Sequence, residues 1–194
     1  MTQIPRQDMK SFKEGMFKDY VGYLEGIAGQ KVDIPFEQYF EDGGRGAFGP
    51  LASYYFTDQS SDNAKIGFAL IEKPDNLVVD SHKVAMLLWQ FYIDKSQQDK
   101  GLGGECARLL LGEHHGHVML KFYNMNTNAR KFWDKVIKKF SNFPNEQKHL
   151  EIPSPDAADP STFYMFSVQR GINGIAADNA KDDNATDKLC LTVG

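Results

Sequence analysis

The chain has 194 residues, which allows one domain or one domain with an appendage, since domains typically contain about 100 to 200 residues. Its composition, 41% hydrophobic and 25% charged, is that of a folded globular protein and excludes the disordered, collagen-like and disulfide-rich classes. The formal net charge of -4 argues against a nucleic-acid partner, because neutralising many phosphates requires an excess of Lys and Arg.

Cysteine usage and hydropathy bear on the compartment. Cys106 and Cys190 are too few for a disulfide framework, and they lack the spacing of a zinc or redox pair. No stretch approaches the roughly 18 apolar residues of a membrane span, and residues 1–10 contain no apolar signal region. We therefore expect a cytoplasmic protein without a membrane partner, either a monomer or a homodimer.

The N-terminal part of the chain predicts two helices. Apolar residues recur at helical spacing from Met9 onward, which predicts a helix that ends near Gly29. Asp33 is a candidate cap, and the apolar residues after it are followed by a glycine pair that begins at Gly43. This pattern predicts a second, shorter helix.

The middle of the chain predicts a hairpin and a crossover. Residues 51–57 and 66–72 are rich in β-branched and aromatic residues and flank a turn-forming segment, which predicts a β-hairpin. Residues 84–93 form a nearly unbroken apolar run, typical of a strand buried on both faces. A helix over 101–112 and a strand over 117–123 follow, so the two flanking strands should run parallel.

The last part of the chain predicts one long helix and one strand. A full apolar stripe follows the capping candidates Asn126 and Thr127 and predicts an amphipathic helix, and residues 162–169 predict a final strand. Gly, Asn, Asp and Ala dominate the end, so we expect a domain over 1–170 and a flexible tail over 171–194. Interleaved helices and strands indicate a mixed α/β fold.

A glycine-rich loop follows the buried strand, with the sequence Gln98-Asp99-Lys100-Gly101-Leu102-Gly103-Gly104. Backbone N–H groups and the positive end of a helix dipole favour an anion at such a place. The dinucleotide fingerprint requires a third Gly where Cys106 stands, and the P-loop signature is absent. The pattern [RQ]-x-x-G-x-[GA] fits through Gln98, Gly101 and Gly103. A tight turn without a ligand is the alternative.

A second motif lies at the next strand-to-helix junction, with the sequence Asn126-x-x-Ala129-x-x-Phe132-Trp133. In this order the two motifs resemble those of the GNAT-type N-acyltransferase family, and the resemblance covers about residues 11–169. The Phe-Trp pair is similar to that of a subgroup of predicted bacterial acetyltransferases. The family implies a mixed, mostly antiparallel central sheet flanked by helices. It also implies transfer of an acetyl group from acetyl-CoA to a primary amine of a small molecule or peptide.

The resemblance further implies which residues bind acetyl-CoA. In the family, the pyrophosphate lies on the amides of the glycine loop, and the pantetheine arm pairs with the central strand beside the second motif. The implied cosubstrate-binding residues are Phe91, Tyr92, Ile93, Gln98, Asp99, Lys100, Gly101, Leu102, Gly103, Gly104, Asn126, Phe132 and Trp133. Asn126 as a helix cap, and Phe132 and Trp133 as core residues, are the alternatives. A backbone N–H near Ile93 would stabilise the oxyanion.

The chain departs from the family at the residues that move protons. Many members carry a Tyr that protonates the leaving thiolate, where this chain has Trp133, and an indole N–H cannot act as this acid. Gln90 stands where a carboxylate base is common. The candidate catalytic residues are therefore Tyr92 and Tyr123, with an ordered water chain as another route. A CoA-binding module with the same fold but no catalysis is the alternative function.

The remaining polar clusters have less specific interpretations. The run His114-His115-Gly116-His117 could hold a metal, but no Cys or carboxylate has a recognised partner spacing, so we expect a solvated loop and no metal. Three acidic residues are candidates to attract a cationic amine: Glu37, Glu41 and Asp42. Three lysines are expected on the solvated side of the last helix: Lys135, Lys138 and Lys139. A locally positive mouth around the phosphate site is expected from Lys95, Lys100 and Arg108.

Overall fold

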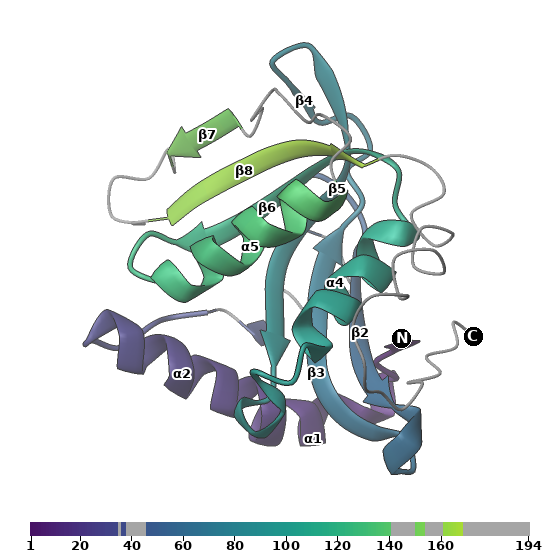
Figure 1. Cartoon of the computed structure of the whole chain (residues 1–194), viewed down its shortest axis with the longest axis vertical. Coiled ribbons are helices and arrows are strands. Elements are labelled where there is room, and N and C mark those ends of the chain that lie inside the picture. Colours follow the sequence, from purple (N-terminus) through teal and green to yellow (C-terminus); the bar gives the residue numbers. More distant parts are fainter. Residues whose placement is uncertain (35, 38–45, 141–149, 154–160, 169–194) are drawn as a thin grey trace, which may run out of the picture.

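The computed structural model describes residues 1–34, 36–37, 46–140, 150–153 and 161–168, shown in Figure 1. The described strands form one sheet with the order β1-β2-β3-β5-β6-β8-β7, and β4 pairs with β5 beside this path. β5 and β6 run parallel, and the other described pairs are antiparallel. The predicted mixed, mostly antiparallel sheet is confirmed. The strands are β1 (Thr2–Gln3), β2 (Leu51–Asp58), β3 (Ala64–Glu72), β4 (Val78–Val79), β5 (His82–Ile93), β6 (Gly116–Tyr123), β7 (Leu150–Pro153) and β8 (Ser161–Val168).

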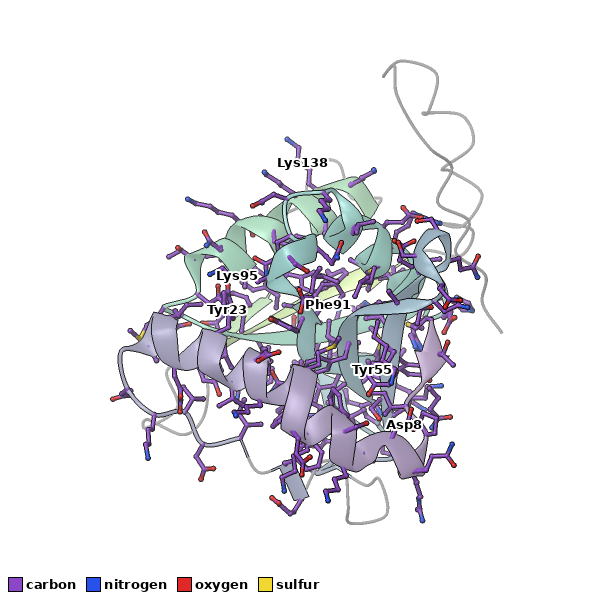
Figure 2. All side chains as sticks on the ribbon, turned by 90° about the horizontal axis from the view of Figure 1, so that it is seen from below. Asp8, Tyr23, Tyr55, Phe91, Lys95 and Lys138 are labelled. Carbon is purple, nitrogen blue, oxygen red and sulfur yellow. The ribbon has the colours of Figure 1, made fainter. Side chains whose placement is uncertain are left out.

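Helices cover both faces of this sheet. Figure 2 shows α1 and α2 on one side and the two later helices, α4 and α5, on the opposite side. The helical segments are η1 (Arg6–Asp8), α1 (Met9–Phe12), the π-helical turn η2 (Lys13–Phe17), α2 (Lys18–Ala28), η3 (Gln59–Ser61), η4 (Lys95–Gln97), α4 (Leu102–Gly112) and α5 (Thr127–Phe140). Within the described residues, every helix is too short or too polar to cross a lipid bilayer.

The larger core lies between the sheet and the pair α4 and α5. Cys106 and Leu110 of α4 and Trp133 and Val136 of α5 pack against apolar side chains of the central strands. The apolar stripe of α5 predicts this contact, because residues three and four apart share one face of a helix. Burial raises the pKa of the Cys106 thiol to about 12, so Cys106 is an uncharged core residue at neutral pH.

The second core lies between the other face of the sheet and the N-terminal helices. Phe12 and Phe17 are both buried there, although residues five apart point in different directions on a regular α-helix. The π-helical turn between them contains a kink at Gly15, whose φ of -105° and ψ of -108° are not helical. Both rings reach the sheet, where Phe12 packs edge-on against Phe68 with ring centroids 5.0 Å apart. α2 then continues on the same face with Tyr20 and Leu24.

Several predicted elements differ in detail from the structure. The predicted N-terminal helix is present but contains the π-helical turn, and it ends at Gly29, whose φ of 66° closes α2. Of the predicted second helix, Phe36 and Glu37 are described and helical, while residues 35 and 38–45 lie outside the described residues. The predicted tail over 171–194 also lies outside them. Strands β1, β4 and β7 were not predicted.

Candidate active site

The central parallel strands separate halfway along their length. Pairing between β5 and β6 stops at Leu88 opposite Leu120, although β3 pairs with β5 as far as Ile93 and β8 pairs with β6 as far as Tyr123. Within the described part of the chain, no strand pairs with residues 90–93 of β5 on this side, which leaves a free backbone edge there. A gap opens between two strands that are both held in place by their outer neighbours.

The backbone groups that face this gap follow from the strand register. Asp94, just beyond β5, donates its N–H to the carbonyl of Ile66 at 2.8 Å. Because bonded and non-bonded pairs alternate along antiparallel strands, the N–H and C=O groups of Phe91 and Ile93 point away from β3, into the gap. The Gln98 side chain donates from Nε2 to the Ile93 carbonyl at 2.8 Å. Both groups of Phe91 and the N–H of Ile93 remain directed at the gap.

A β-bulge in β5 sets which side chains flank the gap. Gln90 pairs with Leu70 while Leu88 pairs with the next residue of β3, so Trp89 is the extra residue. Gln90 accepts a hydrogen bond from the Tyr20 hydroxyl on the α2 side of the sheet, and Trp89 packs on that side too. Phe91 lies on the opposite side and packs against α5. The bulge thus places two consecutive side chains on one face.

A cleft of about 530 Å³ occupies the gap and reaches both sides of the sheet. Of the predicted site residues, its lining contains Phe91, Tyr92, Ile93, Gln98, Asp99, Gly103, Tyr123, Asn126, Phe132 and Trp133. Four predicted loop residues are not in the lining: Lys100, Gly101, Leu102 and Gly104. The two motifs and the central strand, which lie up to about 40 residues apart in the sequence, therefore meet at one place.

The glycine loop presents its backbone at the start of α4. Asp99 and Gly101 have φ values of 61° and 78°, a left-handed conformation that glycine adopts without strain. Among the described residues, the N–H groups of residues 99–103 have no hydrogen-bond acceptor, whereas Gly104 already donates to the Gly101 carbonyl. Five consecutive N–H groups and the positive end of a helix dipole are thus available to an anion.

Aromatic rings form the wall of the cleft on the α4 and α5 side. Phe132 stacks on Phe91 with ring centroids 5.6 Å apart, and Trp133 meets Phe91 edge-on at 5.1 Å. Trp133 is only 4% exposed, so it serves the core and lines the cleft at once. Gly103 lies against this wall, since a Cβ atom there would stand 3.3 Å from Phe132 Cε2.

Solved structures with a similar fold include two acetyltransferases assigned to the GNAT family. A protein assigned to the GNAT acetyltransferases from Bacteroides thetaiotaomicron has 14% identity and a TM-score of 0.54, over 90% of this chain and 92% of that chain. A GNAT-family acetyltransferase from Staphylococcus aureus Mu50 has 12% identity and a TM-score of 0.53, and the match covers 82% of this chain and 94% of that chain. The chain has the GNAT fold. No family model and no curated protein sequence matches it.

The predicted positive mouth is not found in the described lining of the cleft, which contains none of Lys95, Lys100 and Arg108. Arg108 is paired with Glu105, its Nε lying 2.9 and 3.0 Å from the two carboxylate oxygens, so its charge is largely balanced. Lys135, predicted on the solvated side of its helix, is exposed but also lines the cleft, as does Lys131. Lys138 points away from the molecule in Figure 2, as the amphipathic pattern indicates.

Asn126 caps α5. Its Oδ1 accepts the N–H of Ala129 at 3.0 Å, and its carbonyl accepts the N–H of Arg130 at 3.1 Å, so the capping interpretation of this residue is confirmed. Burial raises the pKa of Tyr23, and the nearby Asn126 side chain limits this rise. Asn126 and Tyr23 both line the cleft.

We predict that Asn126→Ala lowers the free energy of unfolding by about 1 kcal/mol, because the first turn of α5 loses its side-chain acceptor. Thermal denaturation should show a Tm lower by about 2–4 °C for a chain of this size. Thr127→Ala is the matched control, since Thr127 is exposed and lies inside the helix. An equal loss in both variants would contradict the assignment of the cap to Asn126.

The two candidate catalytic tyrosines have different surroundings in the GNAT fold of this chain. Tyr92 is 5% exposed and packs among Tyr20, Tyr23 and Phe68 beneath α2. Burial, with smaller contributions from nearby acidic groups, raises the pKa of Tyr92, so its hydroxyl stays protonated at neutral pH. Tyr123 is half-buried at the end of β6 and lines the cleft.

Sequence reasoning did not assign part of the lining. These residues are Tyr20, Tyr23, Leu24, Leu88, Trp89, Lys121, Phe122, Asn128 and Lys131. The spacing of Tyr20 and Leu24 places them on the apolar face of α2, and a buried tyrosine hydroxyl needs a polar partner. This need for a partner is the signal that could have indicated a role for Tyr20. The partner is Gln90, which lies 70 residues away in the sequence, so local patterns do not identify it.

The histidine run does not form a metal centre with its described neighbours. His117 stacks on His82 with centroids 4.2 Å apart, and burial lowers the pKa of His114 to about 4. Among the described residues, no three His, Cys, Asp or Glu side chains lie close enough together to hold a metal ion. His114 and His115 lie between α4 and β6, whereas Gly116 and His117 are the first residues of β6, so the predicted loop is shorter than the run.

Proposed function

We propose that the chain is an acetyl-CoA-dependent N-acetyltransferase that acts on a primary amine. The observation that carries this proposal is that one cleft joins a free edge of β5 to the start of α4, where Asp99 and Gly103 line it and where, among the described residues, the N–H groups of residues 99–103 have no acceptor. A pyrophosphate requires such N–H groups, and a flexible arm with amide groups can pair with a strand edge. The acetyltransferase assignment of proteins with the same fold supports the reaction class.

The residues at the free edge are suited to a thioester. When bound, acetyl-CoA supplies an acetyl group whose carbonyl oxygen becomes negative as the amine attacks. The Ile93 N–H, which points into the gap, donates to this oxygen and contributes about 10²- to 10³-fold in rate. The C–N bond forms, the C–S bond breaks, the ammonium intermediate loses its proton to water, and the thiolate of CoA gains one.

We assign protonation of the thiolate to Tyr123. Both tyrosines are in the lining, but the Tyr123 side chain is half-buried, whereas Tyr92 is buried beneath α2 with its hydroxyl near the backbone of Lys95. Tyr123→Phe should therefore lower kcat about 100-fold, the lower end of what a general acid contributes, with acetyl-CoA affinity unchanged. Steady-state kinetics and calorimetry measure the two quantities. A larger loss of kcat in Tyr92→Phe than in Tyr123→Phe would exchange the two roles.

The test of the function is a thiol-release assay with the full chain, acetyl-CoA and a panel of amines. We expect thiol release that requires both acetyl-CoA and an amine, and a mass increase of one acetyl group on the amine. Calorimetry with acetyl-CoA runs in parallel. Binding without release for any amine would identify a non-catalytic CoA-binding module, and the absence of binding would reject the acetyl-CoA site itself.

A further inference from the structure

The cleft has a second half on the α2 side of the sheet. Along β6, Leu120 and Phe122 belong to the core beneath α4 and α5, so the alternating side chains of Lys121 and Tyr123 lie on the opposite face. The bulge in β5 places Trp89 on this same face. With Tyr20 and Tyr23 of α2, these residues line the part of the cleft that faces away from the glycine loop.

Among the described lining residues, this half of the cleft holds aromatic groups and one positive charge. The Lys121 ammonium lies 5.7 Å from the ring centroid of Trp89 and 5.9 Å from that of Tyr123. The other charged residues of the described lining are Asp99 on the glycine loop and Lys131 and Lys135 on α5. No acidic side chain of the described lining therefore lies on the α2 side.

The acidic residues predicted to attract a cationic amine are not in the described lining of the cleft. Glu37 is paired with Lys13 and is not in the cleft lining, and Glu41 and Asp42 lie outside the described residues. The negative charges of Asp94 and Asp19 contribute to the raised pKa of Tyr92, but neither residue is in the lining. The predicted attraction of a cationic acceptor by Glu37 thus has no counterpart in the cleft.

We propose that the acceptor is a primary amine that also carries a carboxylate and an aromatic body, and that Lys121 binds the carboxylate. This inference rests on the proposed acetyltransferase function. A carboxylate beside a half-buried ammonium makes a charge-assisted hydrogen bond, and aromatic walls favour an aromatic ligand. A polyamine would instead bring several positive charges to a half of the cleft where the charged residue of the described lining is a lysine.

The experiment compares amines that differ only in the carboxylate. The two pairs are phenylalanine with phenethylamine, and 4-(aminomethyl)benzoate with benzylamine, and spermidine represents polycations. For at least one pair, we expect kcat/KM of the carboxylate-bearing amine to exceed that of its partner at least about tenfold. Lys121→Met should reduce this ratio to near one, mainly through KM, and Lys121→Arg should restore much of it. Lys138→Met, an exposed lysine on the outer side of α5, should leave the ratio unchanged.

The outcomes separate the acceptor class from the proposed function. Equal or better acetylation of the amines without a carboxylate, or of spermidine, would overturn the acceptor class and leave the acetyltransferase function in place. An unchanged ratio in Lys121→Met would overturn the role of Lys121. Failure to release thiol with every amine, with or without acetyl-CoA binding, would overturn the acceptor class together with the catalytic function.

Discussion

Gly103→Gln should reduce acetyl-CoA affinity at least about 100-fold, a loss of about 2.7 kcal/mol in binding free energy. A Cβ atom at this position would already lie 3.3 Å from Phe132 Cε2 and 3.6 Å from Ile93 Cγ1. The remaining atoms of the glutamine would have to extend into the cleft that all three residues line. Calorimetric titration with acetyl-CoA measures the loss directly.

The fold should survive this substitution, because Gly103 lies in the first turn of α4 and its φ is not in the left-handed region. Gly26→Gln is the matched control, since Gly26 is exposed on α2 and a Cβ there meets nothing within 4 Å. Circular dichroism should give similar spectra for both variants. Unchanged acetyl-CoA affinity in Gly103→Gln would reject the proposed binding site.

The long elements were predictable because their own sequence carries their pattern. The apolar run of β5 and the stripe of α5 each bury enough side chains to be recognised alone. The two-residue strands β1 and β4 are too short to show any periodicity, and they form because a neighbouring strand offers backbone partners. Such strands depend on tertiary structure that no local window contains.

The candidate site likewise has one part that short motifs predict and another part that depends on tertiary contacts. The glycine loop and the Asn126 cap depend on strand-to-helix junctions that span a few residues, so their chemistry could be predicted from short motifs. The α2 side of the cleft depends on the bulge at Trp89, which a continuous apolar run conceals, and on contacts of Tyr20 across the sheet. Lys121 was not assigned because its face of β6 is set by the pairing with β8.

A buried carboxylate holds the bulge residue in place. Glu72 at the end of β3 is 0% exposed, and it accepts hydrogen bonds from the indole Nε1 of Trp89 at 2.8 Å and the N–H of Gly49 at 2.6 Å. The N–H of Phe48 donates to the same carboxylate. One side chain thus connects the loop before β2 to the strand that lines the cleft.

Glu72→Ala should lower the free energy of unfolding by about 3 kcal/mol or more, because three donors lose one fully buried carboxylate acceptor. Thermal denaturation should show a Tm lower by at least about 6 °C. Glu14→Ala, an exposed glutamate near the N-terminal helices, should have little effect. Trp89→Phe removes only the indole donor, so its loss should be smaller than that of Glu72→Ala and less than additive with it. Full additivity of the two losses would show that Glu72 does not act through Trp89, and that the loop alone requires the carboxylate.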